Sequence, residues 1–138
     1  MGSVPIYDPT RKHVFFGADD GKFYSVHARS GRLIWDVDTK AEIRRKPILF
    51  NDTLYFVNAD NTVFALDPEK GEIVWQYRRP PVEGFSAAGY AGLTLAGGKI
   101  ITGFSDGYMV ALDPIVGSEV WSHDLASEVT RVSAETSS

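Results

Sequence analysis

Acidic side chains and histidines are the residues of this sequence that could carry chemistry. Carboxylates act as general acids and bases or bind calcium, and histidines transfer protons or bind metals. The histidines are His13, His27 and His123, and they show no metal-binding spacing such as HxxxH. The aspartates recur at intervals along the chain, at Asp20, Asp60, Asp67, Asp106 and Asp113. A catalytic or metal site needs converging groups, so we predict no such site and expect these aspartates to hydrogen-bond backbone amides in turns.

The composition argues against several further classes of function. The chain has 138 residues, with 14 Lys and Arg against 18 Asp and Glu, and a pI near 5.3. Excess negative charge disfavours nucleic-acid binding, which needs clustered positive charge. The absence of cysteine removes thiolate nucleophiles, disulfides and cysteine-based metal sites.

The sequence predicts no membrane span and shows no export signal. No run approaches the roughly 18 consecutive apolar residues that a membrane-spanning helix needs. Residues 1–5 lack a basic region followed by an apolar stretch. If the natural protein is exported, we expect its signal to have been removed.

An internal repeat without gaps spans most of the chain. Segments 13–35, 53–75 and 99–121 align, and each ends in a tryptophan. The second and third copies share the motif Ala-Leu-Asp-Pro-x-x-Gly-x-x-Val-Trp, whereas the first has Ser25 and His27 where the others have Ala and Asp. The repeated positions are Trp35, Trp75 and Trp121, Gly31, Gly71 and Gly117, Ala65 and Ala111, and Asp67 and Asp113.

Each copy has the pattern of consecutive β-hairpins. Short runs of β-branched and aromatic residues alternate with turn residues about every ten positions. The first turns tolerate the positive φ angles of hairpins; they are Asp20-Gly21, Asp60-Asn61 and Asp106-Gly107. The second reversal in each copy falls at the repeated glycine. A further apolar run precedes each copy, at 4–7, 45–50 and 90–95, so every repeat predicts four antiparallel strands.

Four strands repeated about every 43 residues are typical of β-propeller blades. We therefore predict an all-β fold in which residues 1–138 form one unit of three four-stranded antiparallel blades. The blades are expected at about 4–38, 42–79 and 86–125, with six extra residues in the second linker, within 80–89. Residues 126–132 are expected to begin a further innermost strand, and 133–138 to be disordered.

The motif at 65–75 and 111–121 resembles the repeat of the PQQ-type, quinoprotein-like β-propeller family. The resemblance covers nearly the whole chain and implies that Trp35, Trp75 and Trp121 each pack against small residues of a neighbouring blade. Quinoprotein dehydrogenases of this kind bind PQQ with calcium in an eight-bladed ring, with a catalytic Asp and commonly an adjacent Cys pair. This sequence has three repeats and no cysteine, so we expect no cofactor.

The resemblance implies one principal function and two alternatives. The principal hypothesis is a noncatalytic protein-interaction scaffold, similar to the propeller lipoproteins of the outer-membrane β-barrel assembly machinery (BamB type). Its partner would be a protein of that machinery, and its location periplasmic or otherwise extracytoplasmic. The alternatives are a fragment of a PQQ-dependent quinoprotein dehydrogenase, with PQQ and calcium, and a ligand-sensing propeller segment of a signalling protein.

Basic residues follow each Trp strand, in the connection to the next blade. Propeller topology predicts that they share one face near the channel mouth, where they could attract an acidic protein or an anionic ligand. The alternative is that they are solvated charges that discourage strand-edge pairing. Aromatic residues of the insertion share that face and suit protein recognition. The candidate partner-binding residues are Arg45, Arg79, Phe85, Tyr90 and Arg131.

The two ends of the chain are complementary. Residues 127–131 repeat 41–45, and Pro5-Ile6 matches Pro47-Ile48, so each end supplies part of an innermost strand. Propellers close with about four to eight blades, and three blades would leave open edges. We predict a homodimer of six blades in which residues 129–132 join the first blade of the neighbour. The alternative is a fragment of a longer propeller.

Overall fold

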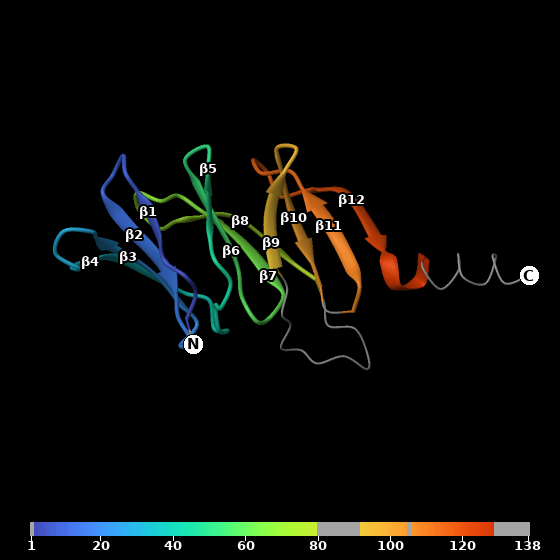
Figure 1. The fold of residues 1–138 in the computed structure, drawn as a ribbon, viewed down its shortest axis with the longest axis horizontal. Helices are drawn as coiled ribbons and strands as arrows, with labels where there is room; N and C mark the ends of the chain where they lie inside the picture. Colours follow the sequence, from blue (N-terminus) through green and yellow to red (C-terminus); the bar gives the residue numbers. More distant parts are fainter. Residues whose placement is uncertain (1, 80–91, 105, 129–138) are drawn as a thin grey trace, which may run out of the picture.

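Three four-stranded antiparallel sheets make up the fold. The structure is a computed structural model that describes residues 2–79, 92–104 and 106–128. The sheets stand side by side in chain order, from the blue N-terminal sheet to the orange C-terminal one (Figure 1). The all-β prediction of three four-stranded blades is confirmed.

Each blade is a meander of four sequential strands. Blade 1 contains β1 (Ile6–Asp8), β2 (His13–Gly17), β3 (Lys22–His27) and β4 (Leu33–Asp38). Blade 2 contains β5 (Ile48–Phe50), β6 (Thr53–Val57), β7 (Thr62–Leu66) and β8 (Ile73–Arg78). Blade 3 contains β9 (Gly92–Ala96), β10 (Lys99–Gly103), β11 (Tyr108–Leu112) and β12 (Glu119–Asp124).

The meander gives every blade two ends. The turns between its first and second strands and between its third and fourth strands lie at one end, which we call the hairpin face. The turn between its second and third strands lies at the other end, together with the connections between blades, and we call this end the connection face. Residues in the second-to-third turns have positive φ angles, 86° at Gly21, 55° at Asn61 and 88° at Gly107.

A small residue faces each tryptophan across the last strand pair. Ser25 pairs with Trp35, Ala65 with Trp75, and Ala111 with Trp121. The register shifts directly after each small residue, at the same place in all three blades. Such a bulge turns the strand locally and so sets the direction of the tryptophan.

The hydrophobic core lies between the blades. One cluster joins blades 1 and 2, where the rings of Phe23 and Phe56 stack with centroids 4.2 Å apart and planes 3° apart. The second cluster joins blades 2 and 3 around Tyr55, Trp75 and Ile100. Burial between sheets is therefore what holds neighbouring blades together. Among the described residues, no helix is long and apolar enough to cross a membrane.

Candidate functional site

The first tryptophan links blade 1 to the last turn of blade 2. Trp35 is 9% exposed, and its Nε1 donates a hydrogen bond of 3.0 Å to the carbonyl oxygen of Pro68. The indole lies so close to Gly71 that a Cβ there would be 2.6 Å from Trp35 Cδ2. Gly71 also has a φ of +73°, which glycine adopts at low cost. Position 71 therefore requires glycine for two reasons, its positive φ angle and the space that the indole of Trp35 takes up.

The second tryptophan repeats this link between blades 2 and 3. Trp75 Nε1 donates a hydrogen bond of 2.9 Å to the carbonyl oxygen of Pro114, and a Cβ on Gly117 would lie 2.5 Å from Trp75 Cδ2. The same carbonyl accepts a second bond, of 2.8 Å, from the Tyr55 hydroxyl. In the motif Pro-x-x-Gly, the proline carbonyl thus accepts the indole N–H of the preceding blade, and the glycine leaves space for the indole ring.

The first repeated glycine, Gly31, and the last repeated tryptophan, Trp121, take part in no such Trp-to-Gly contact within the described residues. A Cβ on Gly31 would meet nothing within 4 Å, although its φ of +73° matches the other two glycines. Trp121 is only half-buried.

Most of the repeated aspartates fix turns. A carboxylate oxygen accepts the backbone N–H two residues later at Asp20, Asp67, Asp106 and Asp113. The tyrosine hydroxyl of Tyr24 adds a bond of 2.5 Å to Asp20, which lowers the pKa of that carboxyl and raises the pKa of Tyr24 to about 12. Asp60 differs, because Asn58 accepts the turn amides instead. Four of the five aspartates therefore hydrogen-bond backbone amides of their own turns, whereas Asp60 pairs with Arg78.

The basic residues of the connection face meet those acidic residues. Arg79 forms an ion pair of 2.6 Å with Asp106, with side chains 15% and 10% exposed. Its guanidinium also lies 5.1 Å from the ring centre of Phe104 and 4.1 Å from that of Tyr108. The hydrogen bond from Arg79 is the main cause of the lowered pKa of Asp106. Arg79 is therefore engaged at the contact between blades 2 and 3, and its role in partner binding stays a prediction.

The other predicted partner-binding residues are placed differently. Arg45 is exposed in the connection between blades 1 and 2, next to Arg44, which pairs with Glu42 and Asp19. Arg78 forms an exposed pair with Asp60. Phe85, Tyr90 and Arg131 lie outside the described residues, as do the insertion at 80–89 and the end segments at 129–132 and 133–138. Of the further strand expected at 126–132, residues 126–128 are described, and they belong to a short helical turn at 125–128 instead.

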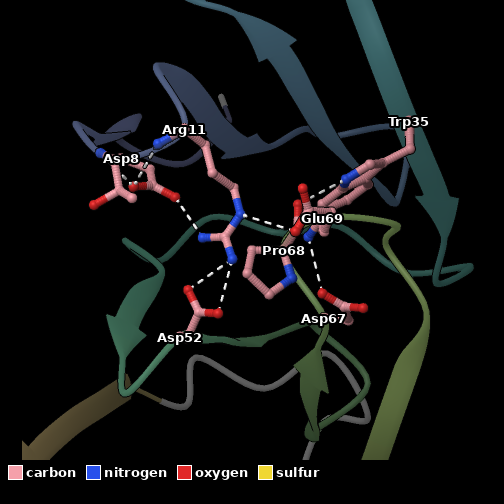
Figure 2. Close-up of polar contacts among 8 residues, drawn as sticks. Asp8, Arg11, Trp35, Asp52, Asp67, Pro68 and Glu69 are labelled. Carbon is pink, nitrogen blue, oxygen red and sulfur yellow. Dashed lines mark hydrogen bonds and ion pairs between the residues drawn. The ribbon is translucent and has the colours of Figure 1, made fainter.

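An arginine on the hairpin face forms a further blade contact that the sequence did not indicate. Arg11 pairs with Asp8 of its own blade at 2.8 Å and reaches Asp52 and Glu69 of blade 2 at 2.7 and 3.7 Å (Figure 2). Its side chain is 14% exposed. Burial raises the pKa of Asp8, but the hydrogen bonds from Arg11 and the turn amides outweigh this and lower it overall. Arg11 stands outside the gapless repeats, in a β1–β2 turn that is longer than its counterparts, so the repeat alignment could not reveal it.

The histidines do not form a metal or catalytic group within the described residues. His13 and His27 face each other across β2 and β3, with ring centroids 5.5 Å apart. Burial lowers the pKa of His13. His123 contacts Glu128 at 2.8 Å. No group of three His, Asp or Glu side chains able to hold a metal ion occurs in the described part of the chain.

A groove runs along the innermost strands β1, β5 and β9. Its volume is about 490 Å³, and Ile6, Tyr7, Lys46, Pro47, Ile48, Leu49, Leu93, Thr94 and Leu95 line it. Most of these side chains are apolar, and one is cationic. Calcium prefers carboxylate and carbonyl oxygens, so these side chains do not fit a calcium-bound quinone.

The sequence is similar to a family model and to proteins of known function. A family model described as outer membrane protein assembly factor BamB matches residues 6–138. BamB of Burkholderia pseudomallei is 30% identical over 92 residues, which cover 66% of this chain and 24% of that protein. Quinohemoprotein alcohol dehydrogenase ADH-IIG of Pseudomonas putida is 27% identical over 106 residues, which cover 72% of this chain and 15% of that protein. The chain therefore spans a quarter or less of either relative.

Solved structures of both kinds share the fold. BamB of Moraxella catarrhalis superposes with a TM-score of 0.68 at 25% identity, covering 88% of this chain and 36% of that one. The quinohemoprotein alcohol dehydrogenase of Comamonas testosteroni gives a TM-score of 0.71 at 21% identity, covering 88% and 20%. With its three blades and repeated Trp-to-Gly contacts, this chain belongs to the PQQ-like propeller-repeat family whose model is described as outer membrane protein assembly factor BamB.

Proposed function

We propose that this chain is part of a noncatalytic protein-interaction scaffold of the BamB type. Its partner would be a protein of the outer-membrane assembly machinery, which places the natural protein outside the cytoplasm. The observation that supports the proposal is the apolar groove along β1, β5 and β9. Exposed apolar surface of this kind is typical of protein-interaction sites.

The backbone of the groove favours an extended partner segment. Each innermost strand stands at the end of its sheet, so β1, β5 and β9 each pair on one side only. A free strand edge offers unpaired N–H and C=O groups to an added strand, while side-chain pockets give specificity. Tyr7 is 54% exposed and Leu95 37% exposed, and both line the groove.

The charges near the groove favour acidic residues in the partner. Lys46 lines the groove, and the neighbouring Arg45 is exposed. Complementary charge raises the rate of association and fixes orientation. Arg45 is therefore the predicted partner-binding residue whose substitution tests this contribution of charge.

The test measures binding of the purified chain to purified components of the outer-membrane assembly machinery. Leu95→Glu and Arg45→Glu are expected to weaken binding at least tenfold. Arg32→Glu is the matched control, because Arg32 is also exposed but lies at the hairpin face. Circular dichroism checks that each variant is folded. Binding that is absent in the parent chain, or unchanged in both groove variants, would contradict the proposal.

A fragment of a quinoprotein dehydrogenase is the second candidate. The 27% identity to quinohemoprotein alcohol dehydrogenase ADH-IIG favours it, and the groove lining, which has no acidic side chain, disfavours it. Addition of PQQ with calcium should leave the melting temperature and the quinone absorbance unchanged. A saturable shift in either quantity would favour the dehydrogenase fragment.

A further inference from the structure

The hairpin face differs between the two contacts of neighbouring blades. Between blades 1 and 2, the β1–β2 turn holds Arg11, which reaches Glu69 in the β7–β8 turn of blade 2. Between blades 2 and 3, Ile115 stands at the repeat position of Glu69. The β5–β6 turn of blade 2 consists of Asn51 and Asp52 alone, and neither side chain is basic. The second contact therefore has no counterpart of the Arg11 bridge within the described residues.

A cavity of about 180 Å³ lies at this second contact, between the β5–β6 turn of blade 2 and the β11–β12 turn of blade 3. Its wall is mainly apolar and includes the rings of Phe50 and Tyr55. Val74, Pro114 and Ile115 add aliphatic surface. Pockets for drug-sized ligands measure about 300–1,000 Å³, so this cavity has room for one large side chain and not for such a ligand.

The apolar rim of the cavity is exposed, and the exposure does not depend on the number of blades. Ile115 is 78% exposed, Val116 63% and Val74 56%. Val74 belongs to blade 2, which has a neighbouring blade on each side. In the same blade, Glu69 and Lys70 are also exposed, and they stand at the repeat positions of Ile115 and Val116. A blade next to blade 3 would therefore leave the rim uncovered, and exposed apolar surface of this kind is typical of protein-interaction sites.

The charges on this part of the hairpin face are mainly acidic. The two hairpin turns of blade 2 and the β11–β12 turn of blade 3 contain Asp52, Asp67, Glu69, Glu72 and Asp113, against Lys70 as their basic residue. Acidic side chains outnumber basic ones even when Arg11 of blade 1 is counted. Complementary charge across an interface raises the rate of association and fixes orientation. The surroundings of the cavity therefore favour a partner segment with basic residues.

We propose that this cavity is a docking site for an aromatic side chain of a partner protein segment, with basic residues of that segment on either side of it. The aromatic ring fills the cavity between blades 2 and 3, as buried anchor residues do at protein interfaces. The basic residues meet the acidic turns around it. This site lies at the end of the blades opposite to Arg45 and selects the opposite charge, so it is separate from the groove along β1, β5 and β9 and does not depend on the function proposed for that groove.

The first test is a titration of the purified chain with the end-blocked peptide Arg-Ser-Phe-Ser-Arg, followed by heteronuclear NMR. Saturable shifts are expected at the amides of Val74 and Ile115 and of their neighbours in sequence. The peptides Arg-Ser-Ala-Ser-Arg, without the ring, and Asp-Ser-Phe-Ser-Asp, with reversed charge, should each bind at least about fivefold more weakly. Equal binding of the three peptides, no saturable shift, or shifts centred on Asp20 and Asp60 of the connection face would overturn the proposal.

Two variants of one turn test whether the cavity itself binds the ring. Ile115→Gln replaces an apolar part of the wall and should weaken binding of the phenylalanine peptide at least about fivefold. Val116→Gln is the matched control, because Val116 is also exposed and lies next to Ile115, outside the wall, and this variant should bind like the parent chain. The groove variant Leu95→Glu should also bind the peptide like the parent, which separates this site from the groove. Equal losses in the two turn variants, or a loss in Leu95→Glu, would contradict docking in the cavity.

Discussion

The indole of Trp75 occupies the space that a side chain at Gly117 would need. A Cβ on Gly117 would lie 2.5 Å from both Cδ2 and Cε3 of the indole, and the contact between Trp35 and Gly71 repeats this relationship at 2.6 and 2.7 Å. Because the proline carbonyl three residues before each glycine accepts the indole N–H, the tryptophan is fixed by both shape and hydrogen bonding. This contact sets the position of one blade relative to the next.

Gly117→Ala should destabilise the fold more than Gly31→Ala. Both glycines have nearly the same φ, +76° and +73°, so both substitutions carry the cost of a left-handed backbone, about 1–2 kcal/mol. Only Gly117 adds a clash with Trp75, and overpacking costs about a further 1–3 kcal/mol. Urea unfolding of both variants measures the difference. Equal losses would show that the indole moves aside without cost.

The two donors to the Pro114 carbonyl should show non-additive energies. Tyr55→Phe or Trp75→Phe alone leaves one hydrogen bond to that oxygen, so the hydrogen-bond loss should cost about 0.5–1.5 kcal/mol each. The double variant leaves the carbonyl without a donor from these side chains and should cost more than the sum. A double-mutant cycle by urea denaturation measures this coupling. Strict additivity would mean that water replaces the lost donors.

Arg79→Ala should destabilise the protein far more than Arg78→Ala. Arg79 and Asp106 are 15% and 10% exposed, and removing one partner of a buried pair costs about 3–5 kcal/mol. Arg78 and Asp60 are 48% and 44% exposed, and such surface pairs contribute about 0–1 kcal/mol. The adjacent position of the two arginines makes Arg78→Ala a close control. Similar midpoints of thermal unfolding would argue against the inter-blade role of Arg79.

Stability should fall in acid partly through Asp106. The hydrogen bond from Arg79 lowers the pKa of Asp106 in the folded state, so its contribution is present above the unfolded-state pKa of about 3.9. It is lost as the pH falls through the folded-state value, because the carboxylate must then be protonated. Asp106→Asn should flatten the decline of the urea midpoint below about pH 4. An equally steep decline in this variant would assign the acid sensitivity to other carboxyls.

The repeat spacing was enough to predict the strands and the blades. Turn residues such as Gly21 and Gly71 and the alternating apolar runs specify hairpins locally, because φ preference and two-residue periodicity depend on neighbours in sequence. Three aligned tryptophans then indicated that the hairpins repeat as blades. The same alignment placed Arg45 and Arg79 in equivalent connections, but it could not show that Arg79 pairs with Asp106 of the next blade.

What only the tertiary structure decided is how the blades contact one another. Arg11 reaches Asp52 across 41 residues of sequence, and Arg79 reaches Asp106 across 27. These two contacts depend on how one sheet packs on the next. The conformational preferences of neighbouring residues in the sequence do not determine this packing. The sequence alone determined that Trp35, Trp75 and Trp121 are equivalent, because their surroundings repeat. The structure distinguished the half-buried Trp121 from the buried Trp35 and Trp75, because burial depends on contacts between residues that are far apart in the sequence.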